Sequence, residues 1–198
     1  MSASAVLAGS IGVTPGPVAV AMAVAVDVVK SVAGLYRHME AGSLSLTNTY
    51  VDIDGDCEVE RREVVCHRLH FKDCRVVIRN VTFTTTSAPN GKCVEVEDCR
   101  TVELVGCTFT CTSASTDMAP YPAREATAAA IYATNSEVRV AGCTVAAPGV
   151  EARGLVVAGG ARATVTNSSF TDTFNSAVWC WKEAWCRLEQ VTVKDCGG

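Results

Sequence analysis

Three residues of types that bind zinc lie within one short segment of the sequence. Cys66, His70 and Cys74 stand at even spacings along it. A zinc site needs four ligands in a tight tetrahedron, whereas an extended strand separates its side chains by about 3.3 Å per residue. These residues therefore meet only if a turn folds the segment back. We expect them to be structural, and we expect the chain to hold no metal or other cofactor.

Acidic residues alternate along the preceding segment, Val51–Glu60. They are Asp52, Asp54, Asp56, Glu58 and Glu60. Oxygen ligands of this kind bind calcium, but the spacing does not match a helix–loop–helix calcium site, in which a glycine follows the third ligand. We expect a solvated strand face here, with calcium binding as the alternative.

Other signatures of chemistry or of nucleic-acid binding are missing from the sequence. No glycine-rich phosphate loop and no Ser/His/Asp arrangement is visible. The net charge is −4 and there is no basic run, so nucleic acid has no electrostatic reason to bind. With 198 residues, 48% of them hydrophobic, the chain is long enough to bury a sizeable core.

A short repeat must position any functional side chains. In Thr101–Thr112 (TVELVGCTFTCT), apolar and polar residues alternate, Gly106 makes a turn, and the alternation resumes. Asn and Gly favour such turns because both tolerate a left-handed backbone. The pattern recurs at 44–50, 76–83, 138–145, 163–170 and 188–193. Six copies of one unit indicate a repeat protein.

The spacing of the copies identifies the fold class. The turn residues are Asn48, Asn80, Gly106, Gly142, Asn167 and Gln190, about 23 to 36 residues apart. A second apolar patch precedes each later turn, so one repeat holds two or three short strands and has no room for a helix. Because one unit cannot bury its apolar face alone, the units must stack. We predict an all-β fold, a parallel β-helix of about six coils.

Stacking assigns each side chain to the inside or the outside of the coils. One inward ladder is expected at Ile78, Leu104, Val140, Val165 and Leu188, and another at Phe83, Phe109, Val145, Phe170 and Val193. An outward hydroxyl row is expected at Thr82, Thr108, Thr144, Ser169 and Thr192. Threonine rows also occur on ice-binding solenoids, but threonine is simply a good exposed strand residue, and we interpret this row as structural.

Residues 1–42 differ in kind from the β-helix expected over 43–198. Val18–Glu40 is predicted to be a helix that caps the open first coil. A signal peptide is the alternative for Val18–Val26, but no positive segment precedes it and Asp27 follows directly. This apolar run is too short to span a bilayer, so we expect no membrane span.

The chain contains eleven cysteines. Cys107 and Cys143 occupy the same inward position, and Cys74 and Cys99 precede their turns by similar counts, as stacked small hydrophobic residues would. A secreted disulfide framework is more typical of a shorter chain with an even count. We predict mostly free thiols made in a reducing compartment, with later disulfides between adjacent coils as the alternative.

Two segments are candidates for contacts with other chains. The insertion at 113–127 explains the longest step between turns, and insertions in solenoids often make contacts. Few residues follow the last copy, so we expect the final coil to be covered by its tryptophan-rich segment or by another chain; tryptophan is enriched at interface hot spots. We expect a homo-oligomer held partly by these two segments. The candidate interface residues are Met118, Tyr121, Arg124, Trp179, Trp181 and Trp185.

The phrases VELVGCTFTC, VRVAGCTV and SAVWCWKEAWCRLEQVTVKDC carry a resemblance to known proteins. Over about Leu44–Cys196, the coils resemble the right-handed, pectate-lyase-type parallel β-helix. They are further similar to the β-helix of the adenovirus large early-region-1B proteins and of their reptile adenovirus capsid relatives, which form a trimeric knob on the virion. The resemblance implies a homotrimeric virion-surface component that contacts other capsid proteins and is made in the host cytoplasm or nucleus.

The resemblance also offers a test for enzymatic activity. Pectate lyases and polygalacturonases place carboxylates, with Arg or Lys, on the outer face of one strand ladder. Glu95 and Glu97 are the acidic residues at the matching positions, and the following coils offer no acidic partner. Glycoside hydrolysis requires two carboxylates at a defined separation. We therefore expect a non-enzymatic structural protein; a carbohydrate-active β-helix with a diverged site is the alternative, and an intracellular adaptor is a third hypothesis.

Overall fold

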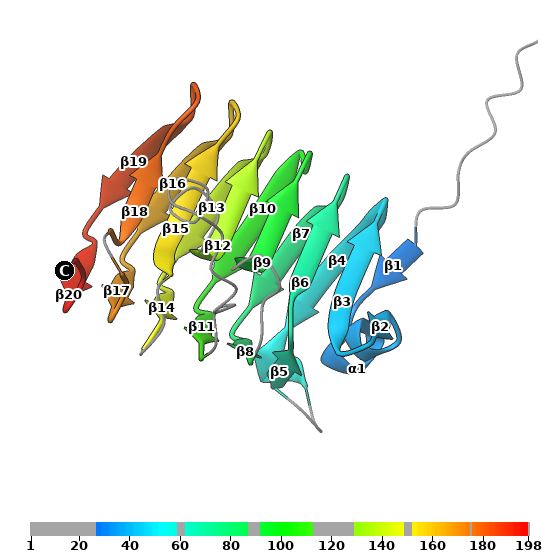
Figure 1. Cartoon of the computed structure of the whole chain (residues 1–198). Coiled ribbons are helices and arrows are strands. Elements are labelled where there is room, and N and C mark those ends of the chain that lie inside the picture. Colours follow the sequence, from blue (N-terminus) through cyan, green and yellow to red (C-terminus); the bar gives the residue numbers. More distant parts are fainter. Residues whose placement is uncertain are drawn as a thin grey trace, which may run out of the picture.

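The computed structural model describes residues 27–58, 62–86, 92–112, 129–148, 152–174 and 176–197. Their strands form three sheets that wind together into a parallel β-solenoid of about six coils (Figure 1). Each coil contributes one strand to each sheet in turn. The predicted all-β parallel β-helix of about six coils is confirmed.

The sheets are numbered here by their order within a coil. Sheet 1 consists of β2 (Met39–Glu40), β3 (Ser43–Thr47), β6 (Leu69–Lys72), β9 (Lys92–Glu97), β12 (Ala129–Thr134), β15 (Arg153–Ala158) and β18 (Val178–Cys180). Sheet 2 consists of β1 (Asp27–Val29), β4 (Thr49–Asp54), β7 (Arg75–Arg79), β10 (Thr101–Val105), β13 (Glu137–Ala141), β16 (Arg162–Thr166) and β19 (Trp185–Glu189). Sheet 3 consists of β5 (Glu63–Cys66), β8 (Thr82–Thr85), β11 (Thr108–Cys111), β14 (Thr144–Ala146), β17 (Ser169–Thr171) and β20 (Thr192–Lys194).

The strand register reproduces the predicted ladders. The first inward ladder runs through Ile78, Leu104, Val140, Val165 and Leu188. The second runs through Phe83, Phe109, Val145, Phe170 and Val193. The outward hydroxyl row lies at Thr82, Thr108, Thr144, Ser169 and Thr192. Alternation of apolar and polar residues therefore decides which side chains enter the core, as expected for strands of period two.

The corner between sheets 2 and 3 uses most of the predicted turn residues. A positive φ, in the left-handed region, is found at Asn80, Gly106, Gly142, Asn167 and Gln190. The backbone N–H of each donates to a carbonyl of the next coil where one follows; for Gly106 and Ala141 the distance is 2.8 Å. Asn and Gly adopt this backbone at low cost, so the corner repeats without strain at every copy except Gln190.

Asn48 is the exception among the predicted turn residues. Its φ is 51°, but it belongs to the corner between sheets 1 and 2, where Asp73, Asp98 and Asn135 are its counterparts. Its strand β3 pairs with β6, and β6 is not in the sheet of the other copies. The prediction that 44–50 occupies the same place in its coil as 76–83 does in the next is therefore wrong. The reason is that both corners use the same chemistry, a left-handed residue followed by a small inward one.

The N-terminal cap is smaller than predicted. Within 27–40, strand β1, helix α1 (Val32–Tyr36) and strand β2 follow one another, so one helix over Val18–Glu40 is wrong, while Val18–Val26 lies outside the described residues. The β-branched Val28 and Val29 pair with the edge of β4 instead of continuing a helix.

The cap nevertheless covers the first coil. Ser31 begins α1 and accepts a hydrogen bond from the Gly34 N–H at 3.0 Å. Val32 and Leu35 are fully buried in the core, and β2 pairs antiparallel with β3. Neither α1 nor the 3₁₀ turn η1 (Gly55–Cys57), the helical elements of the described residues, is long and apolar enough to cross a membrane.

Candidate functional site

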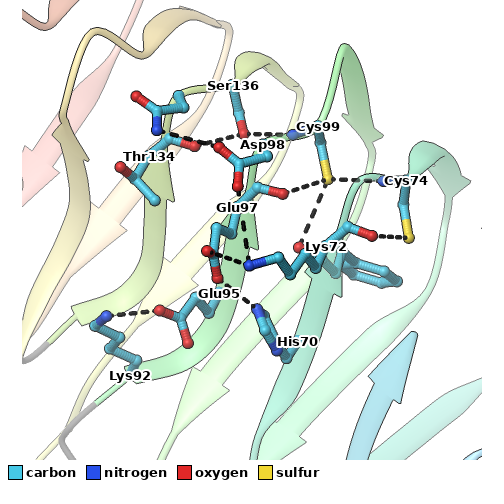
Figure 2. Close-up of polar contacts among 12 residues, drawn as sticks. His70, Lys72, Cys74, Lys92, Glu95, Glu97, Asp98, Cys99, Thr134 and Ser136 are labelled. Atoms are coloured by element: carbon cyan, nitrogen blue, oxygen red, sulfur yellow. Dashed lines mark hydrogen bonds and ion pairs between the residues drawn. The ribbon is translucent and has the colours of Figure 1, made fainter. Parts of the chain in front are cut away.

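Charged side chains gather on the outer face of sheet 1, where β6 and β9 lie side by side (Figure 2). His70 and Lys72 alternate with buried apolar residues along β6, and Glu95 and Glu97 do the same along β9. The register sets His70 beside Glu95 and Lys72 beside Glu97. Opposite charges of neighbouring coils therefore meet directly, and we call this group the charged cluster.

Glu97 is held by two side chains of the preceding coil. Lys72 Nζ donates to Glu97 Oε1 at 2.7 Å, and His70 Nε2 lies 3.3 Å from Oε2. The hydrogen bond with Lys72 lowers the pKa of Glu97 and raises the pKa of Lys72. Burial, followed by the charge of Arg68, lowers the pKa of His70 and so disfavours the protonated ring.

Glu95 lies deeper, with 5% of its surface exposed. Its carboxylate forms ion pairs with Arg68 and with Lys92, whose Nζ is 2.6 Å from Oε1. Lys92 Nζ also lies 4.0 Å from the centre of the Tyr132 ring. Burial, followed by the charge of Arg68, lowers the pKa of Lys92. Because Glu95 is buried and charged, removal of either of its half-buried cationic partners is expected to be costly.

An aromatic stack continues the same face toward the last coil. Trp179, which is in register with Tyr132 two coils earlier through Val156, stacks on Trp181 with ring centres 5.4 Å apart. Arg153 lies 4.1 Å from the centre of the Trp179 ring, and Lys182 lies 4.2 Å from that of Trp181. The stack packs on a small apolar cluster of Ala129, Tyr132, Val156 and Ala158, separate from the main core. These contacts attach the last coil to its neighbour.

Thiols and hydroxyls line the inside of the corner next to the charged cluster (Figure 2). The Cys74 N–H donates to Cys99 Sγ at 3.3 Å, and the Cys99 N–H donates to Ser136 Oγ at 3.0 Å. The contact with Cys74, together with burial, raises the pKa of Cys99. Cys107 and Cys143 occupy equivalent buried positions at the next corner, as predicted. These thiols are packing residues that also satisfy backbone groups.

The predicted free-thiol pattern has one exception among the described residues. Cys93 of β9 and Cys111 of β11 form a disulfide, with their Cα atoms 6.4 Å apart. Both belong to the same coil, whereas the alternative considered from the sequence was a bond between adjacent coils. The remaining nine cysteines are free.

The structure separates the residues considered as metal ligands. Cys66 and Cys74 are buried, whereas His70 faces outward in the charged cluster. Asp54 and Asp56 do converge, but on an amide: Asn80 Nδ2 donates to both, at 3.4 and 2.7 Å. Asp52 instead pairs with Arg79. Within the described part of the chain, no group of three or more potential ligands could hold a metal ion.

The three tryptophans lie on two surfaces. Trp179 and Trp181 belong to the stack on sheet 1, whereas Trp185 is in register with Arg162 on sheet 2 and is 53% exposed. Trp185 forms one wall of an open groove of about 630 Å³ with Glu103 and Arg139. The other interface candidates, Met118, Tyr121 and Arg124, lie outside the described residues.

The last coil, which was expected to be covered by its tryptophan-rich segment or by another chain, presents a further apolar surface. Leu188 and Val193 continue the two inward ladders, yet they are 49% and 55% exposed because no other coil of the described residues stacks on them. β18, β19 and β20 are each the last strand of their sheets, at one end of the solenoid (Figure 1). We call the exposed inward side chains and strand edges of this coil the end face.

The charged cluster is poorly suited to acid–base catalysis. A general acid that works near pH 7 needs a raised pKa, whereas the pKa of Glu97 is lowered and Glu95 is occupied by Arg68 and Lys92. Both carboxylates are visible in the sequence, where an enzymatic site was expected to show acidic partners on the following coils. The cations that hold them come mostly from the preceding coil, and only the strand register reveals that pairing.

Comparison with known proteins adds no relative. No protein-family model matches the chain, and no curated protein and no solved structure is detectably similar to it. The architecture defines the class to which the chain belongs, the parallel β-solenoids. The relationship to adenovirus proteins remains a resemblance of sequence phrases.

Proposed function

We propose that this chain is a non-enzymatic structural protein that assembles through the end face of its last coil. The observation that carries the proposal is the exposure of Leu188 and Val193, two side chains that belong to core ladders. Apolar core positions and free strand edges left in water recruit a partner.

The partner proposed is a second copy of this chain. The opposite end of the solenoid is partly covered, since β1 pairs with the edge of β4, β2 pairs with that of β3, and α1 buries Val32 and Leu35 against the core. An end face therefore does not find there a bare coil of the kind on which it could stack. Two end faces can instead meet around a two-fold axis, which closes the assembly after one contact and prevents open-ended fibres.

The sequence resemblance favours a trimer as the oligomeric state. A trimer requires lateral contacts through the outer faces of the solenoid. The exposed Trp185 and the groove that it lines on sheet 2 are available for such contacts. The resemblance further supports a location on a virion, among other capsid proteins, after synthesis in the host cytoplasm or nucleus. Fixed copy number in purified particles tests that location.

Light scattering on the purified chain tests assembly. We expect an oligomer, with two copies indicating end-to-end contact and three indicating lateral contact. Val193→Asp places a charge on the end face and is expected to shift an end-to-end assembly to monomer. Thr192→Asp, one residue away on the outward row, is the matched control and should leave the mass unchanged. A monomeric wild-type chain, or equal effects of both variants, contradicts the proposal.

The second candidate function, a carbohydrate-active enzyme, is motivated by the position of Glu95 and Glu97 beside Tyr132 on one outer face. Their ion pairs favour the structural interpretation, as argued above. A panel of acidic and neutral polysaccharides, with and without calcium, should yield no products. Turnover that Glu97→Gln abolishes would replace the structural proposal with this one.

A further inference from the structure

Two thiols approach one another at the end face, from different sheets. Cys180 ends β18 and is in register with Val157, a residue of the main core. Cys186 lies in β19 and is in register with the buried Ala163. Both side chains therefore point to the inside of the last coil, on the two sides of the corner between sheets 1 and 2.

The pair flanks one corner and is open to solvent. The two thiols are close enough to influence one another's pKa. Cys180 is exposed and Cys186 is half-buried, whereas the thiols at the equivalent inner corners of earlier coils, such as Cys74 and Cys99, are buried. Proximity and access thus coincide at this pair, because no other coil of the described residues covers it.

We propose that Cys180 and Cys186 form an oxidation site, which a small-molecule disulfide converts into a disulfide bond within the last coil. The inference goes beyond the proposed function and does not depend on it. The molecule already contains a bond of this type, since Cys93 and Cys111 join two strands of a single coil across another corner.

The reaction proceeds by two thiol–disulfide exchanges. The Cys180 thiolate attacks one sulfur of the oxidised small molecule, forms a mixed disulfide and releases the first small thiolate. The Cys186 thiolate then attacks the Cys180 sulfur, forms the Cys180–Cys186 bond and releases the second small thiolate. The protein loses two protons and two electrons, and the oxidised small molecule is reduced to two thiols.

The surroundings of the two thiols indicate which of them reacts first. Burial raises the pKa of Cys180, while burial and the charge of Cys180 raise the pKa of Cys186 to about 12. Cys180 is the more accessible group and ionises first, so it is the attacking thiol. Once it is in the mixed disulfide its charge is gone, which removes one cause of the raised pKa of Cys186. The rate is expected to rise with pH, because the thiolate is the nucleophile.

Peptide mapping tests the site in the full chain. The purified protein is treated with oxidised glutathione at pH 8, quenched with acid, alkylated and digested with trypsin. Cleavage after Arg162, Lys182 and Arg187 places the two cysteines on separate peptides, 163–182 and 183–187. The exposed, solitary Cys57 serves as an internal control and should keep a glutathione adduct.

We expect the two peptides to be joined in monomeric chains, with the linked form about tenfold more abundant than the Cys180–glutathione adduct, since the second step is intramolecular. Cys186→Ser should leave Cys180 as that adduct. The Val193→Asp variant is treated in parallel, so that an assembly covering the end face cannot hide the thiols. The proposal is overturned if both proteins give unlinked peptides while Cys57 reacts, or if the link occurs only between chains on a non-reducing gel.

Discussion

Glu97 illustrates how single residues on the outer face of sheet 1 depend on the coil before them. Its partners Lys72 and His70 lie on β6, one coil away, so the ion pair and hydrogen bonds act between coils. Glu95 repeats the arrangement with Arg68 at greater depth. The charged cluster thus adds polar contacts between two coils to the backbone ladder that joins them.

The lowered pKa of Glu97 predicts a specific response to acid. Because the folded-state pKa lies below the unfolded value of about 4.3, ionised Glu97 stabilises the fold above that pH, and this contribution is lost as pH falls through the folded-state pKa. We expect Glu97→Gln to be less stable than the wild type at pH 7 and to lose less further stability between about pH 5 and pH 3. Urea unfolding across this range measures both effects.

A double variant separates the Glu97–Lys72 pair from other causes. Lys72→Met should flatten the same part of the pH profile, and the double variant should cost less than the two single costs added together. Strict additivity would show that the two residues do not act through one another.

Two corner glycines provide a second prediction at the residue scale. Gly106 and Gly142 both have φ of 62°, but a Cβ at Gly106 would lie 2.3 Å from Asn80 Oδ1, whereas at Gly142 the nearest neighbouring atom is 3.9 Å away. Asparagine tolerates this backbone, as Asn167 shows at the next corner position. We expect Gly142→Asn to stay within about 0.5 kcal/mol of the wild type, and Gly106→Asn to cost about 1 kcal/mol or more, by displacing Asn80 from Asp56. Thermal unfolding of the two variants measures this difference in stability.

The sequence predicts the placement of a residue where that placement depends only on the local pattern of its own strand. Leu104 and Phe109 could be assigned to the core because period-two alternation depends only on the strand itself. The partners of Glu95 could not, because they depend on which residues of different coils come into register. Insertions change the length of each coil, so that register is not visible as a fixed repeat.

The N-terminal cap shows what decides structure at the scale of elements. Val28 and Val29 form a strand because the edge of β4 lies free beside them, and α1 shrinks to one short helix that fills the end of the core with Val32 and Leu35. The sequence predicted a cap at this end, but a helical one, because an apolar run without turns also suits a helix. The structure instead contains β1, because pairing with the free edge of β4 outweighs the helical preference of these residues.

Removal of the cap is predicted to cause aggregation. Deleting residues 1–40 bares the edges of β3 and β4 and uncovers the core side of the first coil. We expect this variant to form large soluble aggregates or precipitate, measured by size-exclusion chromatography. Deleting only 1–26 keeps β1, α1 and β2 and is the matched control, expected to elute as the wild type does. A well-folded product of the longer deletion would show that the cap is dispensable.

At the scale of the whole molecule, the fold is a stack in which each coil contacts only its neighbours. The stability of such a solenoid is approximately a sum of coil and neighbour terms, so position along the stack determines what a core residue contributes. Leu104 lies between Ile78 and Val140 in its ladder, whereas Leu188 has Val165 on one side and solvent on the other. The two leucines are chemically the same and occupy the same place in a coil.

This contrast gives the last prediction. Leu104→Ala should destabilise the fold by about 2–5 kcal/mol through loss of burial and a cavity, with Glu103→Ala, its outward neighbour, near neutral. Leu188→Ala should cost about 1 kcal/mol in the monomer, because its side chain is already half exposed. In the assembly, however, Leu188→Ala should raise the dissociation constant about tenfold, which corresponds to about 1.4 kcal/mol, whereas Leu104→Ala leaves the end face intact. Urea unfolding at low concentration and light scattering over a dilution series measure the two effects separately. Equal unfolding costs at the two leucines would refute the stacked description, and an unchanged dissociation constant would remove the end face from the interface.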